Sequence, residues 1–378
     1  MPTYRGPAPS STDKGQVPVT SSRWPGFASR RIANNRPLFF SGLQGFFGSS
    51  SRPPIETGLS MKELVKILSI DGGGIRGLIP AMVLEELERK LGRPAAELFD
   101  LIVGTSTGAI LALALAVPGK DGKPRYTSRD VVGLYENEGR GIFSRSWLHR
   151  IRALGDLDAA KYQSNGIETV LEKYFGALKL SQSTTNVLIT SYEIERRFPF
   201  FFRSANACSR ADHDFPMKAV ARAASAAPTY FPPAQIANVA ATEHYSLIDG
   251  GVFANNPAAC GLVEAYTAFP ARSYLVASLG TGALTRSIPY RRAKDWGLRQ
   301  WAKPVLDVVF EGVSSTVDYQ LQQLLPANRY FRFQPGLDEQ VQSMDNVKPD
   351  NITALKCVGA RLIHEQARSI DQLCDQLT

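Results

Sequence analysis

Short apolar runs alternate with longer helical patterns from Met61 onward. The runs are rich in β-branched residues, and the stretches between them space their apolar residues three and four apart, as a helix with one buried face does. This alternation predicts an α/β protein, a three-layer sandwich in which helices cover both faces of a mostly parallel sheet. The predicted helices include 77–92 and 109–117. The predicted strands are 65–70, 98–104, 185–195, 198–204, 245–251 and 274–282. We expect 274–282 to be the last strand of the sheet.

The two ends of the chain differ from this alternating centre. Residues 1–60 show no sustained period and are rich in proline, serine and glycine, so we expect them to be mostly disordered. Residues 65–290 form the predicted main domain, and 291–378 a helical extension packed on it. The extension's last stretch places six apolar residues on one helical face, namely Leu355, Val358, Leu362, Ile370, Leu373 and Leu377.

Two aromatic segments each have two interpretations. Residues 295–325 form a predicted amphipathic helix with Trp296 and Trp301 near basic residues, which would lie in a lipid interface or pack over the core or on a second subunit. The phenylalanines of 198–202 fit a lipid contact or, as we favour, a strand that pairs into the core.

Composition and charge narrow the class of protein. Hydrophobic residues make up 44% of the 378 positions and charged residues 21%, as in ordinary globular proteins. The net charge is +8, and the first 60 residues, with seven basic and two acidic side chains, supply +5 of it. With its interleaved aromatic residues this segment is either a solvated tail or a contact for an anionic lipid surface or a partner groove.

Cysteine usage and hydropathy indicate the compartment. The four cysteines, Cys208, Cys260, Cys357 and Cys374, are scattered and fit neither a disulfide framework nor a zinc site. No run reaches the roughly 18 apolar residues of a membrane span. We therefore expect a cytoplasmic protein, with peripheral association with a membrane surface as an accompanying hypothesis.

The sequence GTSTG at 104–108 lies between a predicted strand and a predicted helix. This is the nucleophile-elbow arrangement of serine hydrolases. Gly104 and Gly108 flank Ser106 because so tight a turn leaves no room for side chains at either position. Ser106 is thus predicted to project at a helix N-terminus, where developing negative charge is favoured.

A glycine-rich loop follows the first predicted strand, in the sequence DGGGIRG. Its glycines allow backbone N–H groups to point at an oxyanion, and Arg76 either adds a fixed positive charge or pairs with a structural carboxylate. The same loop satisfies GxGxxG, the dinucleotide-binding fingerprint, but the acidic residue expected after the second strand is missing. The glycines concerned are Gly72, Gly73, Gly74 and Gly77.

A base for Ser106 is not evident among the histidines. None lies on a loop after a predicted strand, so each is interpreted as structural or solvated; they are His149, His213, His244 and His364. Asp249 is the better candidate, because it ends a predicted strand and is followed by Gly250 and Gly251, which keep the loop open. Apolar neighbours would raise the pKa of this carboxylate toward that of a useful base.

The motifs DGGGIRG, GTSTG, DGGVFANNP and SLGTG, with ARAASAAPTYFPP between the second and third, together resemble those of the patatin-like phospholipases over about 65–290. The resemblance implies the patatin-like α/β/α fold and a serine–aspartate dyad, with Ser106 as nucleophile and Asp249 as general base. It further implies an oxyanion hole built from the glycine loop and Arg76. DGG stands where many members have DGA.

The activity implied by the resemblance is phospholipase A type hydrolysis of lipid acyl esters through an acyl-enzyme. No cofactor, metal or nucleic acid polymer is expected to take part. Two alternatives stay open: a general carboxylesterase or thioesterase with the same dyad, and a nucleotide-binding protein that uses DGGGIRG. The layout is also similar to that of patatin-like antiphage effectors activated by a cyclic dinucleotide, which adds antiviral defence as a hypothesis.

Overall fold

The computed structural model describes residues 63–142, 164–239, 241–301 and 304–378. Residues from Leu59 to Thr378 form one compact unit. The predictions for residues 1–60 and for His149 lie outside the described residues.

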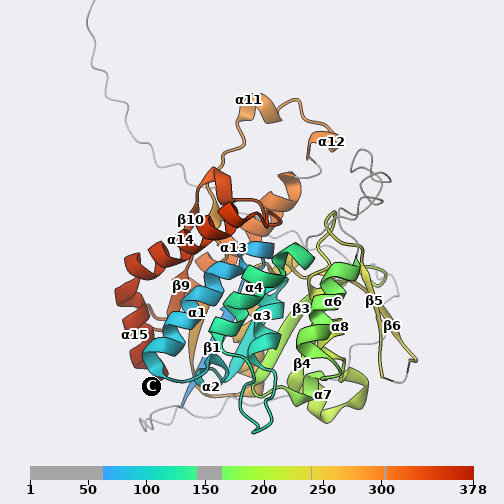
Figure 1. Ribbon diagram of the computed structural model, residues 1–378, viewed down its shortest axis with the longest axis vertical. Coiled ribbons are helices and arrows are strands. Elements are labelled where there is room, and N and C mark those ends of the chain that lie inside the picture. The colour runs from blue at the N-terminus through green and yellow to red at the C-terminus, as the bar shows by residue number, and fades with distance from the viewer. Residues whose placement is uncertain (1–62, 143–163, 240, 302–303) are drawn as a thin grey trace, which may run out of the picture. The chain divides into compact units, whose positions relative to one another are not determined.

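The central sheet is mostly parallel along its main run (Figure 1). Its strands are ordered β5-β6-β3-β2-β1-β7-β9, with β4 also paired to β3, and a small second sheet pairs β8 with β10. The pairs β1–β2, β1–β7, β2–β3 and β7–β9 are parallel, whereas β3–β4, β3–β6 and β5–β6 are antiparallel. The strands are β1 (Leu64–Ile70), β2 (Leu101–Thr105), β3 (Asn186–Glu193), β4 (Phe198–Arg203), β5 (Ala234–Ala237), β6 (His244–Asp249), β7 (Ser273–Leu279), β8 (Ala283–Leu284), β9 (Tyr330–Phe333) and β10 (Gly336–Leu337).

Helices cover both faces of this sheet (Figure 1), so the predicted three-layer architecture is confirmed. Alternate residues of β1 enter different cores: Leu68 belongs to the core that contains buried residues of α1, α3, α4, α8, α14 and α15, and Ile67 to the core that contains those of α10 and α13. The described helices are α1 (Leu78–Leu91), α2 (Ala95–Leu98), α3 (Thr107–Leu115), α4 (Ser128–Ile142), α6 (Ser164–Phe175), α7 (Ser204–Ser209), α8 (Met217–Ala224), α9 (Gly251–Ala254), α10 (Ala258–Ala268), α11 (Tyr290–Ala293), α12 (Leu298–Trp301), α13 (Pro304–Leu324), α14 (Pro349–Glu365) and α15 (Ala367–Leu377).

The predicted strands are all present, with bounds within three residues of those expected. The prediction that 274–282 ends the sheet was wrong, because β9 adds a further parallel strand beside β7. The predicted amphipathic helix over 295–325 corresponds to α12 and α13, which lie on either side of residues 302–303, outside the described residues, and Trp296 precedes both. The final helical stretch is divided at Gln366, although its predicted apolar face is buried throughout.

The phenylalanine cluster belongs to the core, as we favoured. It forms β4, which pairs along β3. Phe200 and Phe202 are 8% and 2% exposed, and their rings lie 4.8 Å apart. Phe198, at the start of the strand, stays exposed.

A buried ion pair ties the late strand β9 to the end of β1. Arg332 donates to both carboxylate oxygens of Asp71, at 2.9 and 2.6 Å. Asp71 is only 1% exposed and directly precedes the glycine loop. Ser314 of α13 donates to the same carboxylate at 3.1 Å. The C-terminal segment thereby completes the support of a loop more than 240 residues earlier in the sequence.

Removing one partner of this pair should destabilise the fold strongly. We expect Arg332→Met to lower the free energy of unfolding by about 3–5 kcal/mol, because it leaves a buried carboxylate without its counter-charge. Urea unfolding measures the change, with the exposed Arg368→Met on α15 as the matched control. The double variant Asp71→Asn/Arg332→Met should recover part of the loss. Equal unfolding midpoints for Arg332→Met and the control would contradict this.

Candidate active site

Ser106 occupies the sharp turn between β2 and α3. Its backbone angles are φ 56° and ψ −122°, a conformation that costs a non-glycine residue roughly 1–3 kcal/mol. A Cβ atom at Gly104 would lie 2.3 Å from the carbonyl oxygen of Gly108, and one at Gly108 would lie 2.2 Å from that of Ile70. Both flanking positions therefore require glycine, as the sequence indicated.

Strand β3 brings the end of β6 to the end of β2. Because β4 runs along one side of β3 over 188–193, β2 and β6 must share the other side. There Thr105 of β2 pairs with Thr190, and Asp249 of β6 pairs with the next residue, Ser191. The two strands meet with their carboxyl ends facing, so the serine turn that follows β2 lies beside Asp249.

The carboxyl group of Asp249 is buried without a counter-charge. The residue is 1% exposed, and its Oδ1 accepts a hydrogen bond of 2.7 Å from the amide of Gly251. Burial raises the pKa of Asp249 to about 7, against the lowering effects of the Ser106 hydroxyl and the Gly251 amide. The Ser106 hydroxyl is near enough to act on this pKa but does not form a full hydrogen bond, since Oδ2 of Asp249 has no such partner among the described residues.

The amides of the glycine loop are committed unequally. The Gly72 N–H donates to the carbonyl oxygen of Asn255 at 3.0 Å and is not available to a ligand. The amides of Gly73 and Gly74 donate to no backbone or side-chain acceptor within the described chain, and both residues line the cavity that contains Ser106. The amide of Thr107, directly after the serine, is likewise free there at the start of α3. Three N–H groups close to the serine in the chain or in the cavity lining are thus without an acceptor among the described residues.

Side chains on the outer side of the loop fix the direction of its peptide planes. Thr281 donates to the carbonyl oxygen of Gly72 at 2.6 Å, and Arg76 donates through Nε to that of Gly73 at 3.2 Å. Because N–H and C=O point in opposite directions across a trans peptide, these bonds turn the amides of Gly73 and Gly74 away from Thr281 and Arg76. Arg76 therefore holds the loop from the side opposite to that toward which these two amides point.

The role of Arg76 in the oxyanion hole stays a prediction, and its side chain is bonded to the outer side of the loop. Its guanidinium lines a second, polar cavity of about 800 Å³, counting open space, which also contains Asp307 and Glu311. Burial lowers the pKa of Arg76 to about 10, and the negative charges of these two residues oppose that shift. Arg76 thus lies on the carboxylate-lined side of the loop.

Two further predicted glycines are also placed by close contacts. A Cβ atom at Gly77 would lie 2.5 Å from Thr107 Oγ1, and one at Gly250 would lie 2.2 Å from Thr190 Oγ1. Gly251 contributes through its amide to Asp249. These positions support the site through close packing and through a backbone donor.

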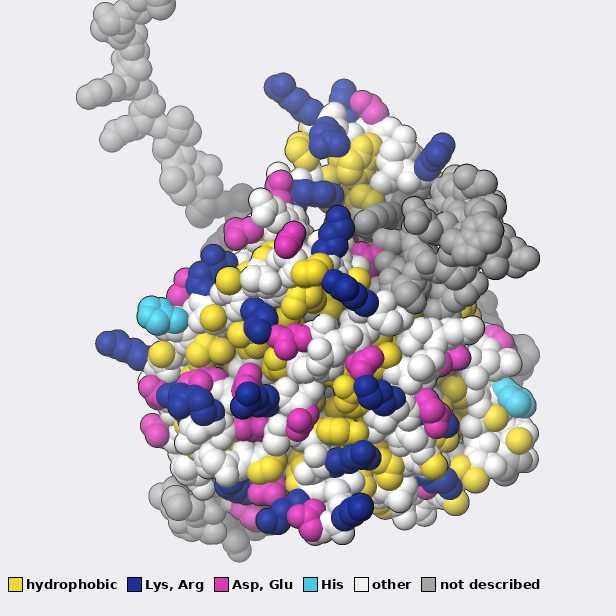
Figure 2. Space-filling model, viewed as in Figure 1, with side chains coloured by type: hydrophobic (Ala, Val, Ile, Leu, Met, Phe, Trp, Pro, Cys, Tyr) yellow, Lys and Arg dark blue, Asp and Glu magenta, His cyan; other side chains and the backbone are white. Residues whose placement is uncertain are grey.

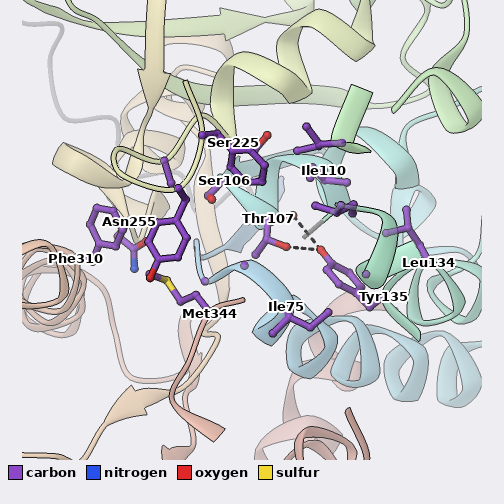
Figure 3. A pocket seen from close by; sticks show the side chains of 18 residues that line it. Ile75, Ser106, Thr107, Ile110, Leu134, Tyr135, Ser225, Asn255, Phe310 and Met344 are labelled. Atoms are coloured by element: carbon purple, nitrogen blue, oxygen red, sulfur yellow. Dashed lines mark hydrogen bonds between the residues drawn. The ribbon is translucent and has the colours of Figure 1, made fainter. Parts of the chain in front are cut away.

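Ser106 opens into an apolar cavity of about 680 Å³, counting open space (Figure 3). One side carries Ile110 and Leu134, and the other carries Asn255, Phe310 and Met344. Its few polar groups, such as the bonded pair Thr107 and Tyr135, are largely satisfied by one another. The reactive hydroxyl group therefore faces a lining suited to a hydrocarbon chain.

No histidine of the described residues lines this cavity. His213 pairs with Asp212 at 3.6 Å, and His244 and His364 are exposed. Within the described ranges, no cluster of three or more His, Cys, Asp or Glu side chains is arranged to hold a metal ion.

Several contributors were not assigned from the sequence. The motifs SLGTG and DGGVFANNP contain Thr281 and Asn255, but a motif does not tell which carbonyl or amide its residues bind. Thr107 had a signal, because the residue after an elbow nucleophile commonly supplies an oxyanion donor. Met344 had none, since it reaches the loop from the far C-terminal segment, where its carbonyl oxygen accepts from Ile75 at 2.8 Å.

Comparison with known proteins places the site in a family. A family model described as patatin-like phospholipase matches residues 68–259. Patatin-like protein 4 of Arabidopsis thaliana is 32% identical over 334 residues, which cover 79% of this chain and 83% of that protein. The Solanum tuberosum protein named probable inactive patatin-3-Kuras 1 is 31% identical, over 80% of this chain and 87% of its own.

The crystal structure of VipD from Legionella pneumophila is 12% identical, covers 80% of this chain and 67% of its own, and has a TM-score of 0.43. The matched range 68–259 contains Ser106, Asp249 and the whole glycine loop. One relative carries "inactive" in its name, so likeness alone does not establish catalysis. By the family match and the extent of the plant relatives, the chain belongs to the patatin-like phospholipase family and has the patatin-like fold.

Proposed function

We propose that the protein is a lipid acyl hydrolase of the phospholipase A type, with Ser106 as nucleophile and Asp249 as general base. One observation carries the proposal: a buried carboxyl group with a pKa near neutrality lies beside a strained serine that opens into an apolar cavity. A carboxylate at its usual pKa is a poor base, and desolvation removes that handicap.

The reaction runs in two halves. Asp249 takes the hydroxyl proton of Ser106, the oxygen attacks the ester carbonyl, and the resulting oxyanion accepts hydrogen bonds from the amides of Gly73, Gly74 and Thr107. The intermediate collapses, and the leaving alcohol receives the proton from Asp249. Asp249 then takes a proton from water, which attacks the acyl-enzyme; as the fatty acid leaves, the proton passes from Asp249 to the Ser106 oxygen and restores both groups.

The cavity supports an acyl ester of lipid as substrate. Its lining of aliphatic and aromatic side chains suits a fatty-acid chain, whereas the neighbouring cavity beyond Asn255 and Phe310 is polar. A general carboxylesterase or thioesterase would use the same dyad but has no need of so apolar a chamber.

The nucleotide-binding alternative is disfavoured by the loop itself. The Gly72 N–H already donates to the carbonyl oxygen of Asn255 and cannot bind a phosphate. The carbonyl oxygen of Met344 fills the space beside Gly74, because a Cβ atom built on Gly74 would lie 2.1 Å from it. The polar cavity outside the loop carries the carboxylates of Asp307, Glu311 and Asp318 beside its two arginines, of which Arg332 is already paired with Asp71. No observation favours a cyclic-dinucleotide site, so such activators enter only as an added arm of the assay.

The first test is fatty-acid release from mixed phospholipid vesicles. Wild type should release fatty acid, and Ser106→Ala should lose at least about a thousandfold in rate, because the nucleophile is gone. Ser225→Ala, which changes another serine of the same cavity, is the matched control and should keep most of the activity. Each protein is assayed with and without cyclic dinucleotides. Equal release by Ser106→Ala and wild type would refute the proposal.

The pH dependence tests Asp249 as the base. Because only the carboxylate accepts a proton, kcat/KM for a soluble short-chain ester should fall about tenfold per pH unit below an apparent pKa of about 7. The profile should be level above that pH. A profile that stays flat down to about pH 5 would contradict a base with this raised pKa.

The buried charge should also lower stability. The folded-state pKa of Asp249 lies above the usual 3.8, so folding is penalised once the pH exceeds 3.8, and the penalty is complete above about pH 7. We expect Asp249→Asn to be inactive yet more stable than wild type at alkaline pH, by on the order of 4 kcal/mol, and the gain to shrink steadily on acidification. Thermal unfolding measured at several pH values checks this. A variant no more stable than wild type at alkaline pH would contradict it.

A further inference from the structure

A segment projects from the body of the protein above the cavities. It comprises residues 286–301, with the short helices α11 and α12, and we call it the basic arm (Figure 1). α12 packs against the start of α13, and α11 makes no comparable packing with another element of the described chain. Among the described elements, the arm is therefore packed most firmly at its base, through α12.

The arm concentrates positive charge. It carries five basic residues and one acidic residue, a net charge of +4 out of +8 for the whole chain. The acidic residue, Asp295, pairs with Lys294 at 3.7 Å. The remaining four are exposed, and within the described residues their side chains form no hydrogen bond or ion pair; they are Arg286, Arg291, Arg292 and Arg299.

Exposed apolar groups accompany these charges. Leu298 is 94% exposed and Tyr290 is 80% exposed. Trp296 and Trp301 pack edge to face, with ring centroids 5.1 Å apart, and neither belongs to a hydrophobic core cluster. Basic and apolar side chains together cover the projection in Figure 2. Arginine, tryptophan and leucine are the residues that an anionic lipid interface accepts.

Adjoining cavities connect the base of the arm with the cavity that contains Ser106. Arg286 and Ile288 line an outer cavity of about 1070 Å³, counting open space, which also contains Met344. Met344 lines the polar cavity and the Ser106 cavity as well. The three cavities thus adjoin one another around Met344, between the arm and the nucleophile.

We propose that the basic arm docks the protein on an anionic lipid bilayer, with its arginines at the lipid phosphates and carboxylates and Leu298 in the interface. Docking there sets the outer cavity at the membrane, so that a lipid leaving the bilayer has a lined path to Ser106. The docking needs no catalysis; only the delivery of substrate rests on the proposed function.

Binding is tested by co-sedimentation of full-length Ser106→Ala protein, which leaves the vesicles intact. Vesicles of phosphatidylcholine alone are compared with vesicles containing roughly one third phosphatidylserine. The protein should favour the anionic vesicles and lose this preference at high salt. In the same background, Arg291→Gln/Arg292→Gln/Arg299→Gln should weaken partitioning roughly fivefold for each charge removed.

The matched control removes three exposed charges from the opposite edge of the sheet, in the variant Lys120→Gln/Lys123→Gln/Arg129→Gln. These residues lie near the end of α3 and the start of α4, away from the serine turn. This control should bind as the parent does. Leu298→Ser tests the apolar part and should weaken binding without altering the salt dependence.

Several results would overturn the proposal. Equal binding of the arm variant and its control would assign docking to another surface, such as the basic residues before position 61. Equal binding to the two kinds of vesicle would exclude electrostatic recognition. A dimer of the parent that the arm variant loses, seen in sedimentation velocity, would assign the arm to a second copy of the chain.

Activity separates this proposal from the proposed function. With an intact Ser106, the arm variant should hydrolyse a soluble short-chain ester as wild type does but lose release from anionic vesicles. Loss of both activities would indicate a damaged site and would contradict a role confined to docking. Absence of hydrolysis in wild type, with binding retained, would refute the proposed function and leave the docking surface standing.

Discussion

The site depends on the shared edge of β3. Since β4 occupies one side of that strand, β2 and β6 must lie end to end on the other, at Thr190 and Ser191. This register alone brings residues 106 and 249 together and buries the carboxylate between strands. It also explains why Gly250 has no room for a side chain, because the turn out of β6 crosses directly over Thr190. A slip of one residue in either pairing would separate the two groups.

Two buried aspartates at the same edge of the sheet differ in the partners of their carboxylates. Asp71 and Asp249 are each 1% exposed. Asp71 is matched by the guanidinium of Arg332 and the hydroxyl of Ser314, so its charge holds the glycine loop and β9 in place. Among the described residues, Asp249 has no cation beside it and its Oδ2 has no hydrogen-bond partner, so its charge is held at a cost. For Asp71 the guanidinium offsets part of the cost of burial, although burial still raises its pKa; for Asp249 no described cation does so, and under the proposed function the raised pKa is what makes it a useful base.

The sequence predicted features that depend on neighbouring residues and did not predict contacts between residues far apart in the chain. The turn at Ser106 follows from five consecutive residues, and Asp249 from a strand end followed by two glycines. The sequence could not predict that Asn255 occupies the amide of Gly72, because that bond joins segments 183 residues apart. Strands β5 and β9 were not predicted, because four residues are too few to establish a hydrophobic period. The direction in which the Arg76 side chain points could not be predicted either, because it depends on the hydrogen bond from Arg76 to the carbonyl oxygen of Gly73.

The two unlike cavities near the serine suit an amphiphilic ester. Ser106 lines the apolar cavity, which shares Asn255, Phe310 and Met344 with a polar cavity lined by carboxylates and arginines. The ester of a lipid lies at a similar boundary within its own molecule, between hydrocarbon and headgroup. Under the proposed function, burial of the chain in the apolar cavity would place the carbonyl near the glycine-loop amides. The polarity of the walls, and not recognition of the headgroup, would then select the scissile bond.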